Sequence, residues 1–264
     1  MLCVYLILLF LLLLFLPMPS RRSMDAWRGT AFAHRGLHGR GIAENTLPAF
    51  KAAAARGYGI ELDVRLSRDG QVMVFHDETL TRMAGDARRV AELDCAELMA
   101  IPLLPGEGRI PRLADVLRAV DGSVPLLIEI KRGDDRRGIC ERTAALLKGY
   151  GGPALVESFD PLVVAWFRWH HPQYRRGQLV GRPVAQAAAR MGRAGKWMLS
   201  GIAFNAIGRP DFIACDVSSG KLPATLGGNR PVAYWTVRDE ETFRRIIEAG
   251  NMAIFEETGE WNIP

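Results

Sequence analysis

Side chains that can do chemistry gather in short clusters of the sequence. They are His-Arg-Gly at 34–36, Glu-Asn-Thr at 44–46, Glu-Leu-Asp at 61–63, His-Asp at 76–77 and Ile-Glu-Ile-Lys at 128–131. Together these clusters supply carboxylates, imidazoles and fixed cations, which are the groups that acid–base chemistry on an anionic ester requires. Whether they act together depends on the elements that bring them to one place.

Three of the carboxylates, Glu61, Asp63 and Glu129, are placed to share a metal ion. Glu61 and Asp63 are two residues apart in an apolar run, so on a strand they point to the same face. Glu129 ends another apolar run in the same manner. Converging carboxylates repel one another unless a cation lies between them, and oxygen-only ligands suit Mg²⁺ or Ca²⁺ better than Zn²⁺. We therefore predict one divalent cation here, and the alternative is that each acid pairs with a nearby arginine.

Two histidines end apolar runs of the sequence, His34 the first and His76 the third. Cleavage of a phosphodiester needs one group to take a proton from the attacking oxygen and one to give a proton to the leaving alkoxide. Because an imidazole titrates near neutral pH, it can do either. Arg35 and Lys131 are the candidates to offset charge on the phosphate oxygens. The other histidines lack such neighbours and are expected to be packed or surface residues, namely His38, His170 and His171.

These clusters belong to a longer string of motifs. In order, the string is H-R-G (34–36), E-N-T-x-x-A-F (44–50), E-L-D-V (61–64), D-G (69–70), V-F-H-D (74–77), I-E-I-K (128–131) and W-T-V (235–237). It resembles the glycerophosphodiester phosphodiesterase family over roughly residues 30–250. The resemblance is most specific over 34–77, good at 128–131 and thin in the last third of the chain.

The resemblance implies a TIM barrel with its active site at the carboxyl ends of the strands. It also implies hydrolysis of a glycerophosphodiester to sn-glycerol 3-phosphate and an alcohol. By position, it assigns acid–base catalysis to His34 and His76, metal ligation to Glu61, Asp63 and Glu129, phosphate binding to Arg35 and Lys131, a place at the rim of the site to Glu44, and a border of the glycerol pocket to Trp235.

The chain departs from the family's pattern near its end. The family usually closes with G-V-D-G-I-x-T-D-x-P, whereas residues 249–258 read A-G-N-M-A-I-F-E-E-T. We expect a diverged final strand there. Because every proposed catalytic residue lies earlier, the departure is expected to concern substrate choice more than the chemistry.

Two other functions compete with this interpretation. The first is a lipid phosphodiesterase of the lysophospholipase D type, which a long apolar pocket wall in residues 78–110 would favour. The second is a non-catalytic binding module tethered to a membrane. The pair of histidines and the trio of acids argue against a module, since a binder needs no proton-transfer pair.

Short apolar runs alternate with amphipathic stretches along the chain, which predicts a parallel sheet with helices outside. About eight such repeats favour a closed (β/α)8 TIM barrel over an open sheet. Strands are predicted at 31–33, 58–64, 71–75, 124–130, 153–157, 177–180, 211–217 and 231–237, with a weak run at 252–255. Helices are predicted at 46–56, 112–120, 139–149, 161–170, 184–198 and 239–249, and residues 78–110 form an insertion with a helix at 91–99.

One connection allows two topologies. Residues 65–70, between the second and third predicted strands, are too few for a helix. A tight turn at Asp69-Gly70 would place His76 opposite Asp63, whereas a parallel crossover would bring both groups to the same barrel rim. Either arrangement predicts that His76 lies beside the acids.

Length and composition are those of a globular enzyme. The chain has 264 residues, 48% of them hydrophobic and 24% charged, which suits one large domain with a real core. The net charge of +5 suits an anionic substrate or an anionic membrane surface. No basic run is interleaved with aromatics, so we expect no nucleic-acid partner.

The amino-terminal segment is strongly apolar. Residues 2–17 carry no charge, and as a helix they would be ~24 Å long, close to the ~30 Å of a bilayer core. Arginines follow the segment at 21, 22 and 28, which predicts an uncleaved anchor with the domain on the cytoplasmic side. The alternative is a cleaved signal and a secreted or periplasmic enzyme. The expected division is an anchor at 1–20, a linker at 21–30 and the barrel at 31–264.

Overall fold

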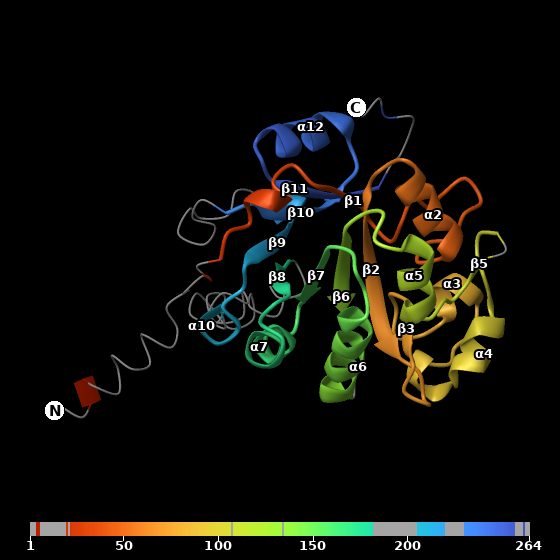
Figure 1. Cartoon of the computed structure of the whole chain (residues 1–264). Coiled ribbons are helices and arrows are strands. Elements are labelled where there is room, and N and C mark those ends of the chain that lie inside the picture. Colours follow the sequence, from red (N-terminus) through yellow and green to blue (C-terminus); the bar gives the residue numbers. More distant parts are fainter. Residues whose placement is uncertain are drawn as a thin grey trace.

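Figure 1 shows the computed structural model of the chain. The structure describes residues 4–5, 20, 22–106, 108–133, 135–181, 205–219, 230–256 and 261. The helix predicted at 184–198 lies outside these residues, as does nearly all of the apolar leader. Among the described residues, no helix is both long enough and apolar enough to cross a bilayer. The anchor and its orientation therefore stay predictions.

The chain forms a closed parallel barrel. Its main sheet has nine strands, of which β3 (Val72–Val74) alone is antiparallel to its neighbour, which leaves eight parallel strands. The first strand pairs with both the second and the last, and this closes the sheet. The predicted TIM barrel is thus confirmed. Its strands are β1 (Ala31–Ala33), β2 (Gly59–Leu66), β6 (Leu126–Ile130), β7 (Ala154–Ser158), β8 (Arg175–Val180), β9 (Phe212–Asp216), β10 (Val232–Val237) and β11 (Met252–Phe255).

Alternation within the strands separates the acids from the outer core. Ile60, Leu62 and Val64 of β2 belong to the largest hydrophobic cluster, together with residues of the surrounding helices. Glu61 and Asp63 alternate with them and therefore point to the other side of the sheet, toward the barrel interior. The same alternation applies to β6, where every residue from 126 to 130 is buried.

The third predicted strand is not a barrel strand. Of the two topologies considered, the chain adopts the tight turn, because β3 folds back antiparallel on the end of β2. The turn is one residue longer than expected, since Ser67 N donates to Gln71 O. Consequently Phe75, rather than His76, lies opposite Asp63, and Phe75 N donates to Asp63 O at 2.9 Å.

The weak run at 252–255 is in fact the eighth barrel strand. It pairs with β10 on one side and with β1 on the other. A run of four residues, MAIF, carries too little periodicity to be distinguished from a loop by sequence alone. In the structure this run closes the barrel, because it fills the position between β10 and β1.

Helices cover the outside of the barrel (Figure 1). Several begin at an aspartate whose side chain accepts a backbone N–H: Asp135, Asp160 and Asp239 cap the helices that follow them. The larger helices are α2 (Leu47–Ala55), α5 (Leu113–Val120), α6 (Arg136–Lys148), α7 (Pro161–His170) and α12 (Glu240–Glu248), and a short α10 (Asn205–Gly208) packs on α7.

The insertion at 78–110 has a small core of its own. Leu80, Met83, Leu98 and Ile110 pack there against Phe75. The helix predicted at 91–99 is shorter and later than expected, because a capping box at Asp94 and Glu97 starts it there. The insertion consists of α3 (Thr81–Ala84), η2 (Val90–Glu92), α4 (Cys95–Ala100), β4 (Pro102–Leu103) and β5 (Gly108–Arg109).

The segment expected to be a linker packs against the barrel. Met24, just before η1 (Asp25–Trp27), is 2% exposed and joins the apolar cluster inside the barrel with Phe32, Leu127 and Phe212. Arg22 donates to backbone carbonyls of residues 172–174, directly before β8. Residues 22–30 therefore close the end of the barrel where the strands begin.

Candidate active site

Three acids converge at the carboxyl ends of β2 and β6. Asp63 and Glu129 are direct neighbours in the parallel register, and Glu61 lies two residues before Asp63. Each of the three offers a carboxylate oxygen, and these oxygens all lie within 4.8 Å of one another. All three residues are buried. The structure thus brings together the trio that the sequence analysis assigned to a metal.

The electrostatics of this trio fit a bound cation. Burial raises the pKa of Glu61 well above its usual range, and the charges of Asp63 and Glu129 raise it further. Burial also raises the pKa of Glu129, to about 7, although Lys131 opposes the change. Oxygens this close can share one ion at the ~2.0–2.6 Å distances of Mg²⁺ or Ca²⁺. A divalent cation among them would keep all three acids ionised.

Lys131 lies between two of the acids. Its Nζ is 2.8 Å from Asp63 Oδ1 and 2.8 Å from Glu129 Oε1. Burial alone would raise the pKa of Asp63, but the charges of Lys131 and Arg35 outweigh burial and hold that pKa far below its usual range. Asn45 Nδ2 donates to the other oxygen, Asp63 Oδ2, at 2.8 Å. Asp63 is therefore a fixed anion at the base of the site.

The loop after β1 delivers Arg35 to the same acids. Arg35 has a φ of 56°, a left-handed conformation that is uncommon outside glycine and occurs often at functional sites. In this conformation its backbone N donates to Glu61 Oε2 at 3.0 Å. Its guanidinium donates to Glu44 Oε1 at 2.7 Å and lies 3.5 Å from Asp63. Gly36 must follow it, because a Cβ there would come within 2.8 Å of Ala49.

Each of the two proposed catalytic histidines is bound by a carboxylate. His34 Nδ1 lies 2.6 Å from Glu256 Oε1, and His76 Nδ1 lies 2.6 Å from Asp77 Oδ1. A carboxylate acceptor places the proton on Nδ1 of a neutral ring, so Nε2 is the nitrogen left for a substrate. The Nε2 of His34 faces the acids, 3.9 Å from Glu61 Oε2.

Burial lowers the pKa of both histidines. For His34 the hydrogen bond with Glu256 opposes burial, and for His76 the charge of Asp63 does so. Burial would raise the pKa of Glu256, but the hydrogen bond with His34 and the charges of His34 and Arg238 lower it to about 2. A lowered pKa favours the neutral ring that a general base requires, whereas the histidine that acts as general acid must carry a proton on Nε2 when it meets the leaving group.

A cavity of about 710 Å³ opens over these groups at the barrel mouth. Eight of the predicted site residues line it, and Asp63 lies beneath it, bonded to Asn45 and Lys131. Those eight are His34, Arg35, Glu44, Glu61, His76, Glu129, Lys131 and Trp235. The Trp235 ring packs edge-on against Phe159, with 5.8 Å between centroids.

Several residues of the site were not assigned by sequence reasoning. Glu256 and Asp77 bind the two histidines, and Glu157 is a fourth buried acid, directly beside Glu129 in the register. His38, which we expected to be an ordinary packed or surface residue, lines the cavity as well. For Glu157 a signal was available, because it stands directly before Ser158-Phe159 at the end of an apolar run.

The fold and the site define a class of protein, namely phosphodiester hydrolases built on a (β/α)8 barrel, with two histidines and a cluster of acids at the barrel mouth. Residues 34–257 match the family model described as the glycerophosphoryl diester phosphodiesterase family. The chain belongs to this family.

Similar proteins agree with this assignment. A glycerophosphodiester phosphodiesterase of Caldanaerobacter subterraneus is 30% identical over 231 residues, covering 83% of this chain and 89% of the relative. A phosphodiesterase of Oleispira antarctica, solved with its product sn-glycerol 3-phosphate, has a TM-score of 0.72 at 22% identity and covers 89% and 95% of the two chains.

Other matches cover less. A human lysophospholipase D is 30% identical over 159 residues, which are 55% of this chain and 49% of that protein. A Bacillus subtilis relative is 35% identical over 150 residues, and the match spans 61% of its length.

Proposed function

We propose that the chain hydrolyses glycerophosphodiesters to sn-glycerol 3-phosphate and an alcohol. The observation that carries this proposal is the pair of carboxylate-bound histidines on the same cavity as the acidic trio. One histidine takes a proton from the attacking oxygen, which belongs to water or to the glycerol 2-hydroxyl. In the second case a cyclic phosphate forms, and water opens it in a second step to give sn-glycerol 3-phosphate. The other gives a proton to the departing alkoxide. The family match and the product bound to the Oleispira relative support the substrate class.

The chain's own cations bind and orient the phosphate. Arg35 lines the cavity, and its guanidinium is held by Glu44. Lys131 also lines the cavity, and its ammonium group lies between Asp63 and Glu129. Glu61, Asp63 and Glu129 would hold Mg²⁺ or Ca²⁺, which when bound supplies Lewis-acid stabilisation of charge on the phosphate oxygens. Trp235 and Phe159 form an apolar wall suited to the carbon face of glycerol.

Release of sn-glycerol 3-phosphate from glycerophosphocholine and glycerophosphoethanolamine, and of lysophosphatidic acid from lysophosphatidylcholine, tests the proposal. We expect release from the first two, loss of release with chelator, and recovery with Mg²⁺ or Ca²⁺. Glu129→Gln should weaken activity and respond to high metal concentration, because one ligand charge is lost. If no glycerophosphodiester yields glycerol 3-phosphate at any metal concentration, the proposed function is wrong.

The lysophospholipase D alternative has support from human, rat and mouse relatives of that name, each of which matches about half of its own length. An apolar wall in the insertion would favour it. Among the described residues, however, the buried apolar side chains of the insertion pack into its own core, and its exposed Met99 and Leu104 lie outside the catalytic cavity, to which the insertion contributes Arg82. We therefore favour water-soluble glycerophosphodiesters over lysolipids. The non-catalytic module has no observation in its favour, since two bound imidazoles beside metal ligands serve no purpose in simple binding.

We also propose that the apolar segment 1–20 tethers the enzyme to a membrane, with the barrel on the cytoplasmic side. The supports are the uncharged run at 2–17 and the arginines that follow it.

A further inference from the structure

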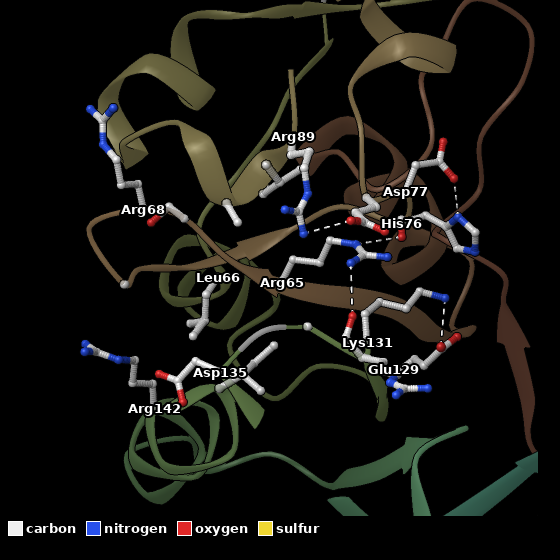
Figure 2. Close-up of a pocket in the computed structure, with 18 of the residues that line it drawn as sticks. Arg65, Leu66, Arg68, His76, Asp77, Arg89, Glu129, Lys131, Asp135 and Arg142 are labelled. Atoms are coloured by element: carbon white, nitrogen blue, oxygen red, sulfur yellow. Dashed lines mark hydrogen bonds and ion pairs between the residues drawn. The ribbon is translucent and has the colours of Figure 1, made fainter. Parts of the chain in front are cut away.

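A second cavity, of about 930 Å³, lies beside the catalytic cavity (Figure 2). The two cavities share His76, Asp77, Glu129, Lys131 and Phe159, so they meet at the catalytic groups. The second cavity runs from there between the insertion and the segment that follows β6. A phosphodiester has two ester arms, and a phosphorus atom at this junction would place one arm in each cavity.

Most acids that line the second cavity are already paired. Asp77 accepts from His76 and Arg82, and Glu78 pairs with Arg89 at 2.8 Å. Asp69 and Asp135 accept backbone N–H groups, from Cys95 and Gly138 respectively, and so stabilise local turns and a helix start. These backbone bonds leave the negative charge of Asp69 and Asp135 in place. Six lysine and arginine side chains nevertheless line the cavity against five acids, one of which, Glu129, belongs to the acidic trio.

Three arginines of the same cavity have no such partner. Within the part of the chain that the structure describes, no carboxylate lies within ion-pair distance of Arg65, Arg132 or Arg142. Arg65 donates to two backbone carbonyls, those of His76 and Arg132, and neither neutralises its charge. Figure 2 shows it between Arg89 and Lys131, with Arg142 toward the end away from Lys131.

We propose that this cavity is the subsite of the departing alcohol and that it selects glycerophosphodiesters whose alcohol carries a second anionic group. The inference rests on the proposed function. Glycerol suits the smaller cavity with its aromatic wall of Trp235 and Phe159, which leaves the larger cavity to the other arm. Arginine forks bind phosphate and carboxylate through charge-assisted hydrogen bonds. A cationic head group such as choline would meet like charges there.

A matched pair of substrates tests the inference. They are glycerophosphoglycerol and the same compound with a terminal phosphate on the departing glycerol, with glycerophosphocholine as a third. We expect a kcat/KM about tenfold or more higher for the phosphorylated compound, since one charge-assisted hydrogen bond contributes roughly that factor. Higher ionic strength should reduce the preference, because these arginines are partly exposed to solvent.

The double variant Arg132→Gln/Arg142→Gln assigns the preference to the cavity. It should bring the ratio of kcat/KM for the phosphorylated and unphosphorylated compounds close to one. Arg137→Gln is the control, because Arg137 lies on the same helix as Arg142, is 82% exposed and lies outside the residues that line the cavity. It should leave the ratio unchanged.

The outcomes distinguish a failure of the leaving-group subsite from a failure of the proposed hydrolase activity. If the wild type cleaves both glycerol compounds equally well, or the double variant keeps the wild-type ratio, the leaving-group subsite is wrong while the hydrolase activity stands. If none of the three compounds yields glycerol 3-phosphate, the proposed function fails and this inference with it.

Discussion

Glu256 and Asp77 each accept a hydrogen bond from Nδ1 of a histidine, at the same distance of 2.6 Å. Each carboxylate fixes the tautomer of its imidazole and directs Nε2 into the cavity. The two partners differ in their neighbours, because Asp77 is also bound by Arg82 and Glu256 by Arg238. Two similar histidine–carboxylate pairs are thus built at one rim of the barrel from segments far apart in the sequence, one after β3 and one after β11.

The two histidines allow the first prediction. His34→Ala and His76→Ala should each lower kcat by about 10²–10⁴, the usual contribution of an acid or a base. The double variant should lose far less than the product of the two, because the groups act in one reaction. His170→Ala on the exposed end of α7 is the control and should keep full activity.

A substrate with a p-nitrophenyl leaving group assigns the two roles, because that group departs with little protonation. The variant that lacks the general acid should recover on it, whereas the variant that lacks the base should not. Full activity of either alanine variant on glycerophosphocholine would rule out the mechanism.

Glu256 allows a prediction about pH. The carboxylate of Glu256 raises the pKa of His34 against the effect of burial. Glu256→Gln keeps an oxygen acceptor but removes the charge, so the pKa of His34 should fall further. Whether His34 acts as base or acid, the limb of the kcat/KM profile that it governs should move to lower pH. The profile of Glu248→Gln, at an exposed position of α12, should match the wild type. An unshifted Glu256→Gln profile would contradict the assigned contact.

Most residues that the structure brings together at the barrel mouth were singled out from the sequence, but Glu256 was not, for a reason that lies in the fold. The trio of acids, the histidines and the cations stand in ordered motifs, whereas residues 249–258 depart from the family's pattern and were expected to matter for substrate choice. In a closed barrel the last strand lies beside the first. His34 N accordingly donates to Phe255 O, and the next side chain after Phe255 reaches the His34 ring. Only strand order, which no local pattern contains, reveals that proximity.

At the scale of elements, strand type was easier to predict than strand pairing. The runs at 58–64 and 124–130 were recognisable because buried strands read as continuous apolar stretches. The run at 71–75 looks the same but forms the hairpin strand β3, since its connection is a short turn closed by Ser67 and Gln71. The predicted proximity of His76 to the acids did not depend on the choice between the two topologies, because the hairpin and the crossover both place His76 at the same rim.

The segment that closes the barrel bottom allows a prediction about stability. Met24 is 2% exposed and packs in the interior cluster with Phe32, Leu127 and Phe212. Met24→Ala should lower the free energy of unfolding by about 2–5 kcal/mol, because the side chain leaves a cavity that its rigid neighbours cannot fill. Met99→Ala is the matched control, since Met99 is 38% exposed on α4, and it should cost under about 1 kcal/mol.

Denaturant unfolding of the two methionine variants measures this difference. Equal effects would mean that residues 22–30 are a linker without a part in the core, as the sequence analysis expected. A large effect of Met24→Ala alone would make the segment part of the folded barrel.

In the whole molecule, Ser20 and Arg22 lie at the end of the barrel opposite the active site. Ser20 N donates to Pro210 O, directly before β9, and Arg22 is bonded to the residues before β8. The acids and histidines stand where the strands end. If segment 1–20 is an anchor, the barrel must face the bilayer with its closed end. The mouth would then open to solvent, which suits a soluble glycerophosphodiester better than a lipid held in the membrane.

This orientation is the last prediction. Fluorescent labels at Gln173→Cys, before β8, and at Glu241→Cys, at the start of α12, mark the two ends of the barrel, and both positions are exposed. In vesicles that contain lipids with a quencher, the label at 173 should be quenched several-fold more strongly than the label at 241. Removal of residues 1–19 should abolish quenching of both labels and leave kcat/KM for glycerophosphocholine unchanged, because no site residue precedes His34. Stronger quenching at 241 would place the mouth on the membrane and favour a lysolipid substrate.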